Sequence, residues 1–105
     1  YALGGEIVAG VLRSSDADFR SNFSLGGRVE PRAADGAQKR IVEKLYEKLR
    51  FDFVGIDFLP DGRGGWILNE IEDAAGARML YRCTDIDIAA LFADYVCKQM
   101  RGREI

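Results

Sequence analysis

Carboxylates are the residues of this chain best suited to chemistry, and three of them, Asp57, Glu70 and Glu72, lie on two neighbouring strand-like segments. Like charges that face each other on a sheet are destabilising, and neither segment contains a Lys or Arg partner. A divalent cation would remove the repulsion, because hard ions such as Mg²⁺ take oxygen ligands, usually one or two carboxylates with waters and phosphates. The three acids therefore predict a metal site; the alternative is a solvated acidic face.

The acids converge only if the two segments pair as a hairpin. Phe51 to Leu59 and Gly65 to Ile71 are strand-like, and the residues between them are dense in turn formers. With Arg63-Gly64 as a two-residue loop, the ladder sets Asp57 directly across from Glu70, and all three acids share one face. A slip of one residue would separate them. The acidic face would also hold Trp66, which either packs or lines a pocket, and the core face would carry Val54, Ile56, Phe58, Ile67 and Ile71.

Length and composition limit what the chain can do. The 105 residues are 48% hydrophobic and 30% charged, which is typical of one small globular domain. A net charge of −2 and a pI near 5.1 argue against nucleic acid or an anionic membrane as the main partner. No apolar run reaches the roughly 20 residues that span a bilayer, and no signal peptide is visible, so we expect a cytoplasmic protein.

Histidine is absent, and the chain has only two cysteines. The missing His removes the usual general base, the Ser-His nucleophile systems and most zinc sites. Cys83 and Cys97 have no metal-ligand spacing, and we expect them to be reduced, structural thiols. Any catalysis must therefore rest on carboxylates, Arg, a metal or positioning.

One more strand and two helices are predicted to position the acids. Glu6 to Arg13 is β-prone and is expected to pair with an earlier strand or with the first hairpin strand. Asp35 to Arg50 is typical of a helix capped by Asp35, and Thr84-Asp85-Ile86-Asp87 resembles a capping box that opens a second helix reaching about Met100. The sum is an α+β fold, an antiparallel sheet packed against two helices. The inward helix stripes would be Ile41, Val42, Leu45 and Leu49, then Ile88, Leu91, Phe92, Tyr95 and Val96.

Basic and glycine residues follow the first strand. The connection from Ser14 to Pro31 contains Asp18-Phe19-Arg20-Ser21-Asn22 and then Gly26-Gly27. Arg matches phosphate bidentately, and glycines let backbone N–H groups approach an anion. Arg20 and Arg13 could therefore face the metal site; the alternatives are solvated Arg side chains and a plain turn.

The order and spacing of these segments resemble the C-terminal subdomain of ATP-grasp ligases, most closely the RimK-like branch. In that family, a strand ending in a basic residue precedes an Asp-Phe-Arg-Ser-Asn-like segment and a Gly-Gly. A helix, a Gly-Val-Asp strand and a Glu-x-Asn strand ending near a Gly then follow. The counterparts here, within Gly5 to Ile88, are Arg13, Asp18 to Asn22, Gly26-Gly27, Gly55-Ile56-Asp57, Glu70-Ile71-Glu72 and Gly76.

This resemblance implies an ATP-dependent carboxylate–amine ligase acting on amino acids or peptides. Such enzymes activate a carboxylate as an acyl phosphate, which an amine then attacks, giving ADP, phosphate and an amide-type bond. The cofactors implied are ATP and a pair of Mg²⁺ or Mn²⁺ ions. Asp57 and Glu70 would bind one ion, and Glu70 and Glu72 would bind the other.

The resemblance also assigns roles around the nucleotide. Arg20 and Arg13 would be catalytic, stabilising the γ-phosphate and the acyl phosphate with fixed positive charge. Asn22 could orient a phosphate or the substrate carboxylate. Leu68 and Glu70 would contribute to binding ATP.

Two positions depart from the family pattern. Glu72 stands where Asn is common, so we expect tighter metal binding and weaker neutralisation of the phosphoryl charge. The segment from Asp73 to Arg78 lacks the Pro that often precedes the Gly. Arg78 either recognises an anionic acceptor or forms a structural salt bridge, and Asp85 and Asp87 are expected to be helix-start charges.

The other half of an ATP-grasp site, with its lysines, adenine-contacting strand and Gly-rich loop, is not in these residues. We therefore expect residues 1–105 to be a single-domain piece of a longer chain, inactive alone. Its partners would be ATP, small carboxylate and amine substrates and the missing N-terminal subdomain. The alternative is a non-catalytic module that binds metal-nucleotide or a partner. A strand edge left exposed by truncation could drive association into homo-oligomers.

Overall fold

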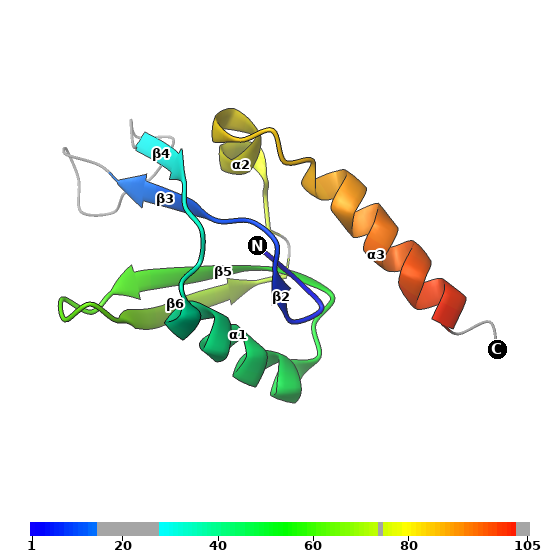
Figure 1. Ribbon diagram of the computed structural model, residues 1–105, viewed down its shortest axis with the longest axis horizontal. Coiled ribbons are helices and arrows are strands. Elements are labelled where there is room, and N and C mark those ends of the chain that lie inside the picture. Colours follow the sequence, from blue (N-terminus) through cyan, green and yellow to red (C-terminus); the bar gives the residue numbers. More distant parts are fainter. Residues whose placement is uncertain (15–27, 74, 103–105) are drawn as a thin grey trace.

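A computed structural model describes residues 1–14, 28–73 and 75–102 (Figure 1). Every strand pair in this part of the chain is antiparallel, so the predicted α+β fold is confirmed, with a third, short helix added. The elements are β1 (Ala2–Leu3), β2 (Glu6–Ile7), β3 (Val11–Ser14), β4 (Arg28–Pro31), α1 (Gly36–Leu49), β5 (Phe53–Pro60), β6 (Trp66–Glu72), α2 (Arg78–Cys83) and α3 (Ile88–Gly102).

The described strands form two sheets, a four-stranded one in the order β2-β1-β5-β6 and the pair β3-β4. Helix α1 lies on one side of the β5–β6 hairpin, and the β3–β4 pair lies on the other (Figure 1). The single strand predicted over Glu6 to Arg13 is wrong, because β2 pairs with β1 and the chain then leaves that sheet to form β3. Strand β4 was expected to be part of a polar connection, whose residues 15–27 lie outside the described part.

A tight turn at Gly4-Gly5 explains why the first strands are so short. Both glycines have positive φ, 56° and 92°, the backbone that a two-residue hairpin with matching twist requires. The turn pairs Leu3 with Glu6, and Leu3 also pairs with Phe53. Strand β1 thus ties the N-terminal hairpin to the central sheet.

The β5–β6 hairpin has the predicted pairing at the acids but not at its turn. Asp57 pairs with Glu70, as expected, whereas the predicted two-residue loop is wrong, because Pro60 pairs with Trp66. The Asp61 carboxylate shapes the longer turn by accepting N–H bonds from residues 63 and 65, at 2.7 and 2.9 Å. A register shift between residues 57 and 58 leaves Asn69 as an extra, bulged residue that restores the predicted acid pairing.

The bulge reverses the faces of the β6 residues nearest the turn, whereas β5 keeps its predicted faces. Ile67 pairs with Leu59 and is 53% exposed, so its predicted place in the core is wrong. Trp66 was expected on the acidic face but lies on the α1 side, edge-on to Phe58 with ring centroids 6.4 Å apart. Its Nε1–H donates to the Asp35 carboxylate at 2.6 Å, and its ring also lines a cavity, so Trp66 both packs on the hairpin and lines a pocket.

Two apolar clusters hold the fold together. On the α1 side, Val42 packs with Ala2 and Val54, joined by the half-buried Ile56, Phe58 and Ile71. The second cluster brings Leu80 of α2 and Ile88 of α3 together with Ala9. Helix α1 begins at the predicted cap: the Asp35 carboxylate accepts from the Gln38 N–H at 2.8 Å, and the Gln38 side chain accepts from the Asp35 N–H.

Helix α3 begins later than predicted. Thr84 instead ends α2, donating its hydroxyl to the Leu80 carbonyl at 2.8 Å, and Asp87 caps α3 by accepting from the Ala90 N–H at 3.0 Å. The predicted inward stripe is only partly buried: Phe92 packs on Phe53, whereas Leu91 and Val96 are 40% and 37% exposed. Cys83 and Cys97 are free, as predicted; Cys83 is partly buried, whereas Cys97, predicted to be structural, is exposed. None of the helices among the described residues is long and apolar enough to span a membrane.

Candidate functional site

The hairpin places the three acids on the face turned away from α1. Asp57 faces Glu70 across the ladder, and Glu72 lies two residues further along β6, opposite Gly55. The apolar side chains of the alternate positions, Ile56 and Ile71, pair with each other and pack toward the α1 cluster. Burial of one face therefore fixes the acids on the other.

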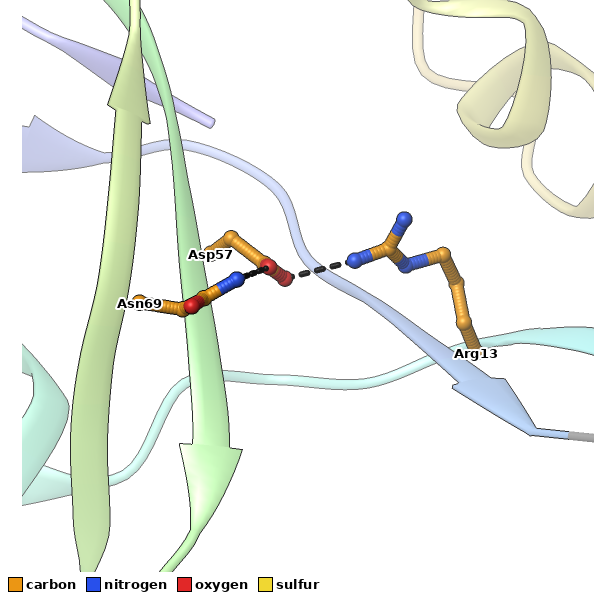
Figure 2. Close-up of polar contacts among 3 residues, drawn as sticks. All are labelled: Arg13, Asp57 and Asn69. Carbon is orange, nitrogen blue, oxygen red and sulfur yellow. Dashed lines mark hydrogen bonds and ion pairs between the residues drawn. The ribbon is translucent and has the colours of Figure 1, made fainter. Parts of the chain in front are cut away.

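Arg13 reaches the acidic face from the second sheet (Figure 2). It lies on β3, where it pairs with Val29 of β4. Its guanidinium donates to Asp57 Oδ1 at 2.6 Å, with the two side chains 36% and 23% exposed. Ion pairs this open to solvent contribute little stability, about 0–1 kcal/mol, so the contact can be exchanged for another at small cost.

Asn69 contacts the same carboxylate from the other side. Its Nδ2 donates to Asp57 Oδ2 at 2.8 Å, so that Asp57 lies between Asn69 and Arg13 (Figure 2). In a regular ladder, neighbouring residues point to opposite faces, and the bulge is what brings Asn69 and Glu70 to the same side. Asn69 was not among the predicted site residues. The available signal was the consecutive polar pair Asn69-Glu70, which breaks the two-residue alternation of the strand.

Glu70 is the acid of this face whose pKa the neighbouring carboxylates raise. A hydrogen bond with the Glu72 carboxyl raises the pKa of Glu70 above its usual value, and repulsion by Glu72 and Asp57 acts in the same direction. The Arg13 charge opposes the rise. Glu70 is thus a carboxylate that gains from any added positive charge.

The donor atoms suit a hard cation, although they are not arranged as a finished metal site. Among the residues that the structure describes, no three Asp, Glu, Cys or His side chains already form a metal-binding cluster. Asp57 instead accepts hydrogen bonds from Arg13 and Asn69, while Glu70 and Glu72 interact with each other. Carboxylate oxygens that lie close together repel one another, and Mg²⁺ or Mn²⁺ would relieve this repulsion by binding them.

A cavity of about 460 Å³ adjoins the acids, a volume in the range of small-molecule sites. Arg13, Asp57, Glu70 and Glu72 line its polar part. Successive residues of β5, which point to alternate faces, also line it, so the cavity extends around the edge of that strand toward α1. Its apolar wall includes Ile7, Val42, Ile56, Phe58 and Trp66.

The remaining predicted site residues are placed as follows. Leu68 pairs with Phe58 on the half-buried side of β6, beyond the bulge from the acids. Arg20, Asn22 and the Gly26-Gly27 pair lie outside the described residues. Arg78 is the first residue of α2.

An antiparallel hairpin with acids on one face, a helix on the other and an Arg-bearing strand pair opposite is the arrangement of an ATP-grasp C-terminal subdomain. Comparison with family models agrees: residues 1–96 match the RimK-like ATP-grasp domain. The chain belongs to this family.

Relatives with known names share its sequence at moderate identity. The chain is 38% identical over 93 residues to the Mycoplasma genitalium protein named "Uncharacterized protein MG011" (87% of the chain, 32% of that protein). It is 32% identical over 90 residues to the "Probable alpha-L-glutamate ligase" of Pasteurella multocida (85% and 28%). The Haemophilus influenzae protein of the same name is 27% identical over 97 residues (91% and 32%). The chain thus spans about a third of the length of these relatives.

Proposed function

We propose that residues 1–105 form the C-terminal half of the ATP-grasp domain of a longer ATP-dependent ligase, which joins a carboxylate to an amine. Membership of the RimK-like family supports ATP as the nucleotide. The names of two relatives support glutamate as one substrate. The share of those relatives that the chain covers supports a larger protein, in which the missing half completes the site.

The observation that carries this proposal is the meeting of Arg13 with Asp57 and Glu70 at a cavity between two sheets. A phosphoryl group in transfer needs fixed positive charge and carboxylates that can hold a cation. Both are here on separate elements, 2.6 Å apart at Arg13 and Asp57. Purely structural ion pairs do not require additional crowded carboxylates beside a cavity.

The reaction proposed has two steps. An oxygen of the substrate carboxylate attacks the γ-phosphorus of ATP, the bond to the ADP oxygen breaks, and an acyl phosphate forms. The amine nitrogen then attacks the acyl carbon, phosphate leaves and the amine gives up a proton. Arg13 and Arg20 stabilise the negative charge on the transferred group, and Asn22 orients a phosphate or the carboxylate.

Asp57 and Glu70 would hold one Mg²⁺, and Glu70 and Glu72 a second. When bound, Mg²⁺ neutralises the charge of the phosphates during transfer. Leu68 lies on the neighbouring stretch of β6, and we assign it a contact with the nucleotide. Catalysis of this kind rests on positioning and electrostatics, which explains how the residues could function in a chain without His.

A second candidate is a module that binds metal-nucleotide without ligating anything. It is favoured by Glu72, whose extra negative charge lowers the net positive charge that the bound metals offer to a phosphoryl group. The two candidates share the same metal residues and differ in turnover.

The test is ADP release by the full-length protein with Mg²⁺, ATP and a panel of amino acids and peptides that includes glutamate. Glu70→Gln should abolish acceptor-dependent release, whereas Glu47→Gln, an exposed position on α1, should not. Nucleotide binding without release by the unmodified protein would favour the non-catalytic module. Release that survives Glu70→Gln would contradict the site assignment.

A further inference from the structure

The two oxygens of Asp57 have different partners. Oδ1 accepts from Arg13 at 2.6 Å, and Oδ2 accepts from Asn69 at 2.8 Å (Figure 2). Arg13 belongs to the separate β3–β4 pair, whereas Asn69 belongs to the same hairpin as Asp57. The Asn69 contact is therefore built into the local strand geometry, while the Arg13 contact depends on how the two sheets meet.

The β6 bulge lies at Asn69, the residue that contacts Asp57 Oδ2. Asp57 pairs with Glu70 and Phe58 pairs with Leu68, which leaves Asn69 without a ladder partner. A bulge disrupts the ladder and re-aims a side chain. The side chain re-aimed here is the one that holds Asp57 Oδ2.

Holding one oxygen changes what kind of ligand the carboxylate can be. A carboxylate with both oxygens free can chelate a cation, a mode that suits the large and flexible coordination shell of Ca²⁺. A carboxylate with one oxygen free offers a single ligand, which suits the small octahedral shell of Mg²⁺. Groups that hydrogen-bond to a metal ligand orient it and tune the metal that binds.

We propose that Asn69 is a positioning residue that determines metal specificity: by holding Oδ2, it limits Asp57 to a single metal-facing oxygen and favours Mg²⁺ over Ca²⁺. The inference rests on the metal site of the proposed function. Arg13 and a cation compete for Oδ1 of Asp57. Oδ2 stays hydrogen-bonded to Asn69 both with and without the cation. In this role Asn69 acts through Asp57 and is not itself a metal ligand.

The experiment is a Mn²⁺ titration of the full-length protein, followed by electron paramagnetic resonance, with Mg²⁺ and Ca²⁺ as competitors. The variants are Asn69→Ala and Asn69→Val; the second keeps a strand-favouring side chain in case the first fails to fold. Tyr95→Phe is the matched control, because it removes a hydroxyl donor from another aspartate, Asp52, bonded at 2.8 Å. Asp57→Asn tests the metal site itself.

The expected result is a shift of the ratio of Ca²⁺ to Mg²⁺ affinity toward Ca²⁺ by roughly 10-fold in both Asn69 variants, the lower end of measured effects of such ligand-orienting groups. Tyr95→Phe should leave the ratio unchanged. A ratio that Asn69→Val does not alter overturns the inference while the metal site stands, provided that Asp57→Asn weakens Mn²⁺ binding. Mn²⁺ binding that Asp57→Asn leaves intact overturns the metal site, and the inference with it.

Discussion

The two ends of strand β6 treat a carboxylate in opposite ways. At the first end, Trp66 donates to Asp35, and this hydrogen bond, with the N–H bonds of the α1 cap, lowers the pKa of Asp35. At the last end, a hydrogen bond with Glu72 and the repulsion that accompanies it raise the pKa of Glu70. The same strand thus carries one carboxylate that the fold satisfies and one that it leaves in conflict.

This difference distinguishes an acid whose charge the fold stabilises from one whose charge the fold leaves opposed by other carboxylates. Donors surround Asp35, which links a helix start to a strand, so its charge contributes to folding. In the described part of the chain, Glu70 has carboxylates around it, and the charge of Arg13 only partly opposes them. The Glu70 charge therefore works against folding until a cation binds. Residues that cost stability without a ligand are typical of binding sites.

The largest effect should come from removing the charge of Glu70. Glu70→Gln should weaken Mn²⁺ binding by about 10- to 100-fold or more, since it would remove a proposed direct ligand and effects of that size already follow from losing ligand-orienting groups. Electron paramagnetic resonance of free Mn²⁺ measures the change. Asp35→Asn, at the other end of the comparison, should leave Mn²⁺ affinity unaltered, and equal losses in the two variants would erase the distinction.

Loss of the donor at the first end should destabilise the fold. Trp66→Phe keeps the aromatic packing on Phe58 but removes the hydrogen bond to Asp35, and it should lower the midpoint of thermal unfolding by a few degrees. Differential scanning calorimetry at neutral pH measures this. A midpoint equal to that of the unmodified protein would mean that the Trp66 donor contributes nothing to Asp35.

The stabilising role of Asp35 should depend on pH in a defined direction. Because its folded pKa lies below the ordinary value of 3.8, the folded protein binds this proton less tightly than the unfolded chain, and the contribution is fully present above that value. It should disappear as the pH falls through the folded pKa. Urea unfolding between pH 7 and pH 2 should therefore show the gap between the unmodified protein and Trp66→Phe closing at the acid end. A gap that widens on acidification would contradict the assignment.

A smaller and opposite effect is expected at the last end. Glu72→Gln removes the main cause of the raised Glu70 pKa, so without metal it should raise the unfolding midpoint slightly at neutral pH. The sign follows from linkage: a carboxyl with a raised folded pKa gives stability at low pH that is lost as the pH rises through that pKa. The gain from Glu72→Gln should shrink below pH 4.5, the ordinary value for Glu. Destabilisation at neutral pH would show that Glu72 is a structural partner.

The pairing of Asp57 with Glu70 could be predicted from the sequence because two errors compensated. Alternation places apolar residues on one face, and this requirement holds whatever the turn does. The turn is longer than predicted, since Asp61 organises it with backbone bonds, and the bulge at Asn69 offsets the extra residue. The same bulge made the predicted faces of Trp66 and Ile67 wrong.

The elements that sequence patterns missed are short and depend on distant partners. Strand β1 is two residues long, and its place is fixed by Phe53 and Val54 far along the chain. Strand β4 exists because β3 pairs with it, and the buried Leu80 of α2 packs against Ala9. The contact between Arg13 and Asp57 spans two sheets, so residue types could indicate it but pairing rules within one sheet could not place it.

The Gly4-Gly5 turn has a consequence for how this family is compared. A side chain at Gly4 would meet the Tyr95 ring at 2.8 Å, and one at Gly5 would meet the Tyr46 ring at 2.7 Å, so helices α3 and α1 both press on one turn. Selection should therefore keep both glycines in relatives that keep both rings, for reasons of space as well as of backbone conformation. In an alignment, an invariant Gly-Gly at this position would resemble an anion-binding loop, although its cause would be the packing of two aromatic rings against the turn.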